Sequence, residues 1–447
     1  MNRVLSFTFL FSFISVICQG QSNYTLQQCI DTALANNIPA KQKQLLSESA
    51  QVDLRQARSN QLPNVLADVY HGASQGKSID PNSNTYVNQN LNYANYEVNS
   101  QITVFNGGNL QNAVKQYANA FEASKMEWQQ AKDNLVLDVI LAYLQVLTDE
   151  DLVLSANRQA DVSQKQLDRL QILNNQGAIR PSDVSDLKGQ LMNDQLTIVN
   201  YKNNLESDKL KLAQLMNKQY DPGMKLERID AGEFMTPYPN TSGQVYETAL
   251  QQFSLIKAVE LRRKSFEYGV KSARGALFPT LAIGGGVNSN YSSTAQNATG
   301  KIPYNSQLVN NIATGVFVGL QIPIFNRFQL RNRVRYADIN LKNSILVEQS
   351  AKIQLGQQID QAYLNMSNAY EKYKVLLEQV NAYTESFRAA EVRYNAGVGN
   401  SVDYLTAYLQ AKDRLDRANT NLISAKYEFV LRKKILDYYS NTVKAEK

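Results

Sequence analysis

Apolar and polar side chains alternate along four short stretches of this chain. The alternation is almost strict over residues 93–105 and again over 310–324, with most apolar side chains on one parity. A period of two predicts strands with one apolar face, turned toward a protein core or toward lipid. Residues 64–71 and 280–291 show the same pattern more weakly. Four amphipathic strands are therefore expected, two in each half of the chain.

Most of the remaining chain has the pattern of very long helices. Residues 110–176 contain neither Gly nor Pro, and residues 328–396 contain only Gly356. At about 1.5 Å per residue, helices of this length extend roughly 100 Å. Gly177 and Gly397 are expected to end them, after which the chain returns in a second helix. The returning helices are predicted over 181–217 and 401–438, and one further helix over 26–61.

The two halves of the chain are related by duplication. Gln101-Ile-Thr-Val-Phe-Asn106 recurs as Gln321-Ile-Pro-Ile-Phe-Asn326, and the same offset of 220 relates Asp183 to Asp403. A register that holds over such a distance indicates duplication of a large unit rather than a short solenoid repeat. We therefore expect one elongated structure built from two strand–strand–helical-hairpin repeats. The first repeat is assigned to residues 21–230 and the second to residues 231–447.

The N-terminus has the features of an export signal. A positive start is followed by an apolar run too short to span a bilayer and then by small residues, which predicts a signal peptide over residues 1–20. Lipidation at Cys18 is an alternative, although the residues before it lack the usual pattern. The mature chain keeps only Cys29, so no internal disulfide is expected.

Composition argues against several classes of function. The formal charge of +6 is spread along the chain without a basic cluster, which argues against nucleic-acid binding. His71 is the only histidine, so neither histidine-dependent catalysis nor a Cys/His metal site is expected. We therefore expect no enzyme activity, no metal and no cofactor.

Four strands are too few to close a membrane barrel. An open sheet edge in lipid would leave backbone N–H and C=O groups without partners. Three chains that contribute four strands each would supply twelve, enough for a wide closed barrel. Once a membrane location is accepted, this count favours a homotrimer. The long helical hairpins would extend from the strands and line an aqueous conduit.

The chain resembles the TolC-like outer-membrane efflux family over essentially its whole mature length. The resemblance rests on the duplicated strand-end motif, Val104-Phe-Asn-Gly-Gly108 and Ile324-Phe-Asn-Arg327, on the helix-ending prolines and on the two hairpin tips. It implies a mainly α-helical homotrimer with a twelve-strand β-barrel in outer-membrane lipid and a periplasmic tunnel of long antiparallel helices. It also implies docking to a periplasmic adaptor (a membrane fusion protein) and an inner-membrane pump.

The resemblance also assigns roles to residues near the hairpin tips. Asp403 matches a family aspartate that constricts the tunnel, and a ring of three carboxylates would favour cations. Thr406 replaces a second aspartate that the family often has. Tyr394 and Asp183 match residues that latch the closed tip. The arginine that often completes this latch is absent, and Arg180 is a candidate to replace it.

A structural role for the same aspartates remains open. An Asp that follows a helix-ending Gly also suits the cap or first turn of the returning helix. The adaptor is expected to dock on the tips around Gly177, Gly397 and Gly399, whose small size permits close approach. A different class of protein also remains possible, namely a soluble periplasmic coiled-coil scaffold or adaptor, which would need no amphipathic strands.

Overall fold

The computed structural model describes residues 23–79, 83–88, 90–229, 235–396 and 401–440. The predicted signal peptide and Cys18 lie outside these ranges. The chain forms two compact units, and each contains segments from both halves of the sequence. The sheet unit comprises residues 39–131 and 246–358, and the helical unit comprises residues 1–38, 132–245 and 359–447.

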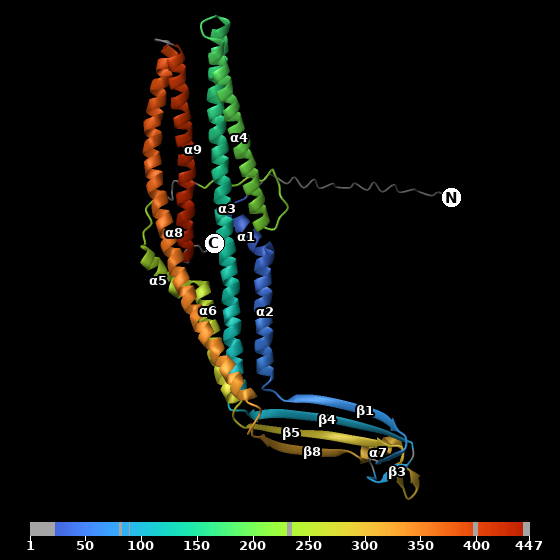
Figure 1. The fold of residues 1–447 in the computed structure, drawn as a ribbon. Helices are drawn as coiled ribbons and strands as arrows, with labels where there is room; N and C mark the ends of the chain where they lie inside the picture. Colours follow the sequence, from blue (N-terminus) through green and yellow to red (C-terminus); the bar gives the residue numbers. More distant parts are fainter. Residues whose placement is uncertain (1–22, 80–82, 89, 230–234, 397–400, 441–447) are drawn as a thin grey trace, which may run out of the picture. The chain divides into compact units, whose positions relative to one another are not determined.

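The sheet unit is built on a four-stranded antiparallel sheet with the strand order β1-β4-β5-β8 (Figure 1). Its strands are β1 (Asn64–Ser74), β4 (Leu91–Phe105), β5 (Thr280–Ser292) and β8 (Ala313–Gln321). The register places Val98 opposite both Ala67 and Val287. The two halves of the chain therefore meet along β4 and β5, in the middle of the sheet.

The register gives the sheet one apolar face and one mostly polar face, because directly opposed residues of antiparallel strands point to the same side. The exceptions on the polar face include Leu66, Tyr70, Leu91, Tyr93 and Phe317, and those on the apolar face include His71, Ser100, Ser289 and Thr314. The apolar face carries Val65, Ala67, Val69, Ala94, Tyr96, Val98, Ile102, Leu281, Ile283, Val287, Val316, Val318 and Leu320. The polar face carries Asn64, Asp68, Asn95, Glu97, Asn99, Gln101, Thr103, Asn288 and Asn290, with Gly284 and Gly286.

Two details of the strands differ from the sequence pattern. The register shifts between Thr103 and Phe105, so Phe105 rather than Val104 lies opposite Leu281. This bulge ends the alternation that the sequence continues to Val104. The strand predicted over 310–324 is also shorter, because helix α7 (Tyr304–Asn310) precedes β8 and Pro323 follows it. Two short strand pairs lie between the long strands: β2 (Lys77–Ile79) with β3 (Tyr86–Asn88), and β6 (Gln296–Asn297) with β7 (Gly300–Lys301).

Four helices join the sheet at the same end. Helices α2 (Ile38–Ser59) and α6 (Ser254–Gly275) lead into β1 and β5, whereas β4 and β8 lead into α3 (Asn109–Asn175) and α8 (Gln329–Ala396). Since neighbouring strands are antiparallel, these four connections lie at the same end of the sheet. Figure 1 shows the helical segments meeting the sheet at that end.

The helix predicted over 26–61 is divided in two. Helix α1 (Leu26–Asn36) begins with the expected Thr25 cap, which forms a capping box with Gln28. Asn37 then has an extended backbone before α2 begins. Pro39 explains the break, since it lacks an N–H and cannot continue the hydrogen-bond ladder of α1.

The helical unit contains two antiparallel hairpins, formed by α3 with α4 (Pro181–Leu215) and by α8 with α9 (Ser401–Tyr439). Helix α5 (Ser242–Gln252) precedes α6. Leu167, Leu170, Leu187 and Leu191 form a buried cluster in the first hairpin, and Met366, Phe429 and Leu436 form one in the second. Within the described ranges, no helix is both long and apolar enough to cross a membrane.

Candidate functional site

The turn of the first hairpin is a Schellman motif centred on Gly177. The backbone N–H of Ala178 donates to Leu173 at 2.9 Å, and that of Gly177 donates to Asn174 at 2.9 Å. Gly177 has φ = 72°, a left-handed conformation that favours glycine. Pro181 then opens α4, where its missing N–H costs nothing. The tip is therefore a tight turn with small residues. Gly397 and Gly399, at the matching turn, lie outside the described residues.

Asp183 lies in the first turn of α4 and is only 6% exposed. It does not cap the helix. The cap position is occupied by Arg180, whose side chain makes no capping hydrogen bond. The Ser182 hydroxyl donates to the Asp183 carboxylate at 3.3 Å. A buried carboxylate in the first turn interacts favourably with the positive end of the helix dipole. Of the two structural roles expected for Asp183, the structure therefore favours the first-turn position over capping.

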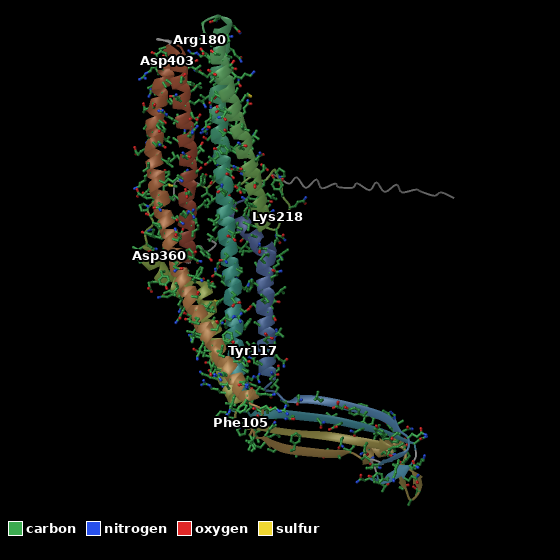
Figure 2. All side chains as sticks on the ribbon, in the orientation of Figure 1. Phe105, Tyr117, Arg180, Lys218, Asp360 and Asp403 are labelled. Atoms are coloured by element: carbon green, nitrogen blue, oxygen red, sulfur yellow. The ribbon has the colours of Figure 1, made fainter. Side chains whose placement is uncertain are left out.

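Asp403 is placed differently, although it is the duplicate of Asp183. It lies in the first turn of α9 and is exposed, as is Thr406 one turn later. Leu405 and Tyr408, on the other side of the same turns, are buried. Figure 2 shows the labelled Asp403 and Arg180 at the same end of the helical unit, on different hairpins. An exposed carboxylate at this end is available to ions in solution.

Tyr394 packs into the core between the two hairpins. Its ring stacks on Tyr408 at 5.2 Å between centroids, and it contacts the leucine cluster of the first hairpin. Burial raises the pKa of the Tyr394 phenol, and the nearby charge of Asp183 adds to this effect. The structure therefore brings two of the three predicted latch residues, Tyr394 and Asp183, into electrostatic contact.

Arg169, which the sequence did not indicate as a candidate, interacts with the second hairpin near Tyr394. Arg169 of α3 donates a hydrogen bond to the side chain of Asn395 on α8, and its charge partly offsets the upward shift of the Tyr394 pKa. Arg169 lies two helical turns before Gly177. The sequence could have indicated Arg169 only by its closeness to the tip. Its partner, Asn395, lies on the other hairpin and is distant in sequence.

A buried ion pair also joins the two hairpins. Lys412 of α9, whose side chain is 3% exposed, lies 3.1 Å from the carboxylate of Asp194 on α4 and 2.6 Å from that of Asp416. The Ser163 hydroxyl of α3 donates to Asp194 at 2.5 Å. Burial raises the pKa of Asp416. The sequence shows only a Lys and an Asp four residues apart, a spacing more typical of an exposed helix face.

Two carboxyl groups face each other inside the first hairpin. Asp149 of α3 is buried beside Asp208 of α4, and one Asp149 oxygen has no hydrogen-bond donor. Burial, with the neighbouring Asp208, raises the pKa of Asp149 to about 7. Lys211 of α4 and Gln145 of α3 oppose this shift. Asp149 is therefore protonated below neutral pH.

The curated relatives of this chain include outer-membrane proteins. Outer membrane protein TolC of Escherichia coli (strain K12) is 22% identical over 308 residues, which cover 68% of this chain and 60% of TolC. Toxin and drug export protein A of Aggregatibacter actinomycetemcomitans is 20% identical over 322 residues, which cover 70% of this chain and 64% of that protein. The chain thus spans less than two thirds of the length of each.

A solved structure with the same fold covers nearly the whole chain. The outer membrane protein VceC of Vibrio cholerae matches with a TM-score of 0.78 at 15% identity, over 93% of this chain and 96% of VceC. The chain therefore has the fold of VceC, a mainly helical chain with a sheet. The profile described as outer membrane efflux protein matches residues 29–218 and 245–435. The chain is an outer-membrane protein and belongs to the outer membrane efflux protein family.

Proposed function

We infer that three copies of this chain form a passive channel for efflux or type I secretion across the outer membrane. The observation that carries this proposal is the four-stranded sheet. It has one apolar and one polar face, and its edge strands β1 and β8 each pair on one side only within the described residues. Val316 on β8 is 92% exposed. A twelve-strand barrel made from three such sheets would pair both edges and turn the apolar face to lipid.

The helical hairpins would continue the conduit into the periplasm. Each of α3 and α8 exceeds 65 residues, which corresponds to roughly 100 Å. The Toxin and drug export protein A and TolC relatives support a transport role rather than catalysis. In this proposal the two repeats, 21–230 and 231–447, are equivalent building blocks of one duct. The tips would dock to a periplasmic adaptor that connects the channel to an inner-membrane pump.

The same proposal gives roles to the tip residues. Asp403 and Thr406, both exposed, would line the constriction, where three carboxylates favour cations. Asp183 and Tyr394 would hold the closed tip from within the core, which their burial supports. Arg180 completes the predicted latch, whereas Arg169 has the contact with the second hairpin. Gly177, Gly397 and Gly399 would form the adaptor-docking surface.

Cysteine crosslinking between edge strands tests the closed barrel. Cysteines placed at Val69 on β1 and Val318 on β8 are expected to join different chains, giving dimers and trimers in denaturing gels. The control pairs Val98 on β4 with Val318, because β5 lies between these strands in every chain. Scanning Val65 and Ala67 against Val318 covers alternative registers between chains. Absence of crosslinks at every register would contradict the barrel.

Extraction distinguishes the channel from a soluble periplasmic scaffold. The exposed apolar face of the sheet predicts that detergent is needed to release the protein from cell envelopes. The released particle is expected to have about three times the mass of one chain. Release of a monomer by osmotic shock alone would favour the scaffold.

A further inference from the structure

Basic and aromatic side chains gather where β8 passes into α8. Four arginines, Arg327, Arg331, Arg333 and Arg335, occur within nine residues, and all four are exposed. Ile324, Phe325 and Phe328 beside them are 93%, 72% and 54% exposed. This cluster departs from the expectation that the positive charge is spread evenly along the chain.

The aromatic and basic residues contact one another. The rings of Phe325 and Phe328 lie edge to face with centroids 5.6 Å apart. The Arg331 guanidinium lies 5.8 Å from the centroid of Phe328. The apolar end of the strand therefore passes directly into a cationic surface, and these side chains form one patch rather than scattered exposed residues.

The internal duplication shows that the fold does not require this patch. The matching junction of the first repeat has the same backbone turn: Asn109 donates to Asn106 at 3.1 Å, as Gln329 donates to Asn326 at 3.1 Å. At the duplicated positions the first repeat has Gly107, Gly108, Gln111, Ala113 and Lys115 in place of Arg327, Phe328, Arg331, Arg333 and Arg335. Three of the four arginines thus replace uncharged residues.

Two of the substituted positions also have unfavourable backbone geometry. Gly107 and Gly108 have φ values of 64° and 77°, and Arg327 and Phe328 adopt 57° and 63°. L-residues avoid this left-handed region. The second repeat keeps an arginine and a phenylalanine where glycine would be unstrained, which indicates that these side chains serve a function.

We propose that this junction binds the anionic phosphate headgroups of phospholipids at the membrane surface. Two observations favour a phosphate headgroup as the ligand: the position of the patch beside the apolar face of the sheet, and its positive charge. The patch directly continues the apolar face of a sheet in an outer-membrane protein, and it carries only positive charge between Arg327 and Arg335. The arginines of α6 differ, since Arg262 and Arg263 pair with Glu127 and Glu348. This inference rests on the proposed membrane channel.

The positions of the arginines along α8 match the thickness of a lipid headgroup layer. Polar headgroups occupy roughly 5–8 Å on each side of the hydrocarbon core. Arg331 and Arg335 lie two and six residues into α8, roughly 3 and 9 Å along its axis. At about 100° per residue they share one face of α8, and Arg331 contacts the Phe328 ring, whereas Arg333 lies on the opposite face. We assign the lipid contact to Arg331 and Arg335. Figure 2 labels Phe105 at the junction of the first repeat, which lacks the patch.

The test measures lipid preference of the full-length protein in phosphatidylcholine vesicles. Spin-labelled phosphatidylglycerol is compared with spin-labelled phosphatidylcholine in the motionally restricted, protein-contacting lipid. We expect phosphatidylglycerol to be enriched, and the preference at this site to fall about fivefold for each arginine removed, which corresponds to about 1 kcal/mol. The test variant is Arg331→Gln with Arg335→Gln, since Gln111 occupies the position of Arg331 in the first repeat. The control is Arg333→Ala, which introduces the residue type of Ala113.

The outcomes separate this inference from the proposed function. Loss of preference in the double variant, with Arg333→Ala unchanged and channel conductance retained in both, supports it. No phosphatidylglycerol preference in conducting wild-type protein overturns the inference alone. Equal loss in Arg333→Ala overturns the assigned face. If the double variant instead dissociates into monomers with unchanged lipid preference, the arginines bind a neighbouring protomer and the inference is wrong. Vesicles without conductance contradict the channel itself.

Discussion

The two hairpins place a duplicated aspartate in opposite environments. Asp183 begins α4 and is buried, whereas Asp403 begins α9 and is exposed. The same contrast extends along the hairpins. Asp149 and Asp208 face each other in the first, but the duplicated positions in the second are Ala369 and Glu428. Glu428 pairs with Lys372 at 3.0 Å instead.

This difference shows how duplication and specialisation combine. The duplication fixes the helix ends and the register, so both aspartates occupy a first helical turn. Their neighbours then decide their roles. The Asp183 carboxyl group lies inside the protein near Tyr394, whereas the Asp403 carboxyl group is exposed at the surface. In the proposed channel, the first hairpin would have the structural role and the second would line the pore.

The largest expected effect comes from breaking the ion pair that joins the hairpins. Lys412→Met introduces the residue that the first repeat has at Met192, and it leaves Asp194 and Asp416 buried without their cation. Loss of one partner of a buried pair costs about 3–5 kcal/mol. Denaturant unfolding of the purified protein measures the change in the free energy of unfolding.

Lys165→Met is the matched control for this variant. Lys165 pairs with Asp161 at 2.6 Å, but both side chains are mostly exposed. An exposed pair contributes about 0–1 kcal/mol. Similar destabilisation by the two variants would show that burial of Lys412 has no special importance.

The buried Asp149 of the first hairpin predicts one component of the pH dependence of stability. The pKa of Asp149 is about 7 in the folded protein, above its ordinary value of 3.8, so the folded state holds an additional proton between these values. Stability therefore falls as the pH rises through this window, by at most about 1.4 kcal/mol per pH unit, and levels off above it.

Asp149→Asn is expected to remove this component of the pH dependence and to be more stable than wild type at pH 8. Unfolding measured from pH 5 to pH 8 tests the difference between the two proteins. Glu428→Gln, at the duplicated position of Asp208, is the control for loss of a carboxylate from the second hairpin. An equal slope in wild type and Asp149→Asn would rule out the additional proton on Asp149.

The smallest expected effect on stability compares the duplicated aspartates directly. Asp183→Asn removes a buried charge from the start of α4 and is expected to cost about 1 kcal/mol. Asp403→Asn, at an exposed position, is expected to change stability by less than about 0.5 kcal/mol. Thermal unfolding of both variants measures this difference. If Asp403→Asn costs as much as Asp183→Asn, the two environments are not distinct.

The sequence predicted the elements better than the contacts between them. Strict alternation identified the strands, and the absence of Gly and Pro identified the long helices, because both signals are local. The bulge before Phe105 was missed because it depends on geometry that an apolar pattern does not show. The break at Asn37 was missed because the apolar pattern continues across Pro39, the residue that causes it. Lys412 and Arg169 were missed for another reason. Their partners lie on other helices, more than 200 residues away in sequence.

Ion conductance of the purified protein in planar lipid bilayers tests the proposed channel most directly. We expect discrete conductance steps with a preference for cations. Asp403→Asn should reduce this preference, whereas Asp183→Asn should leave it unchanged. Absence of conductance from the correctly assembled protein, or a selectivity that changes with Asp183 and not with Asp403, would contradict the proposed channel and its pore-lining hairpin.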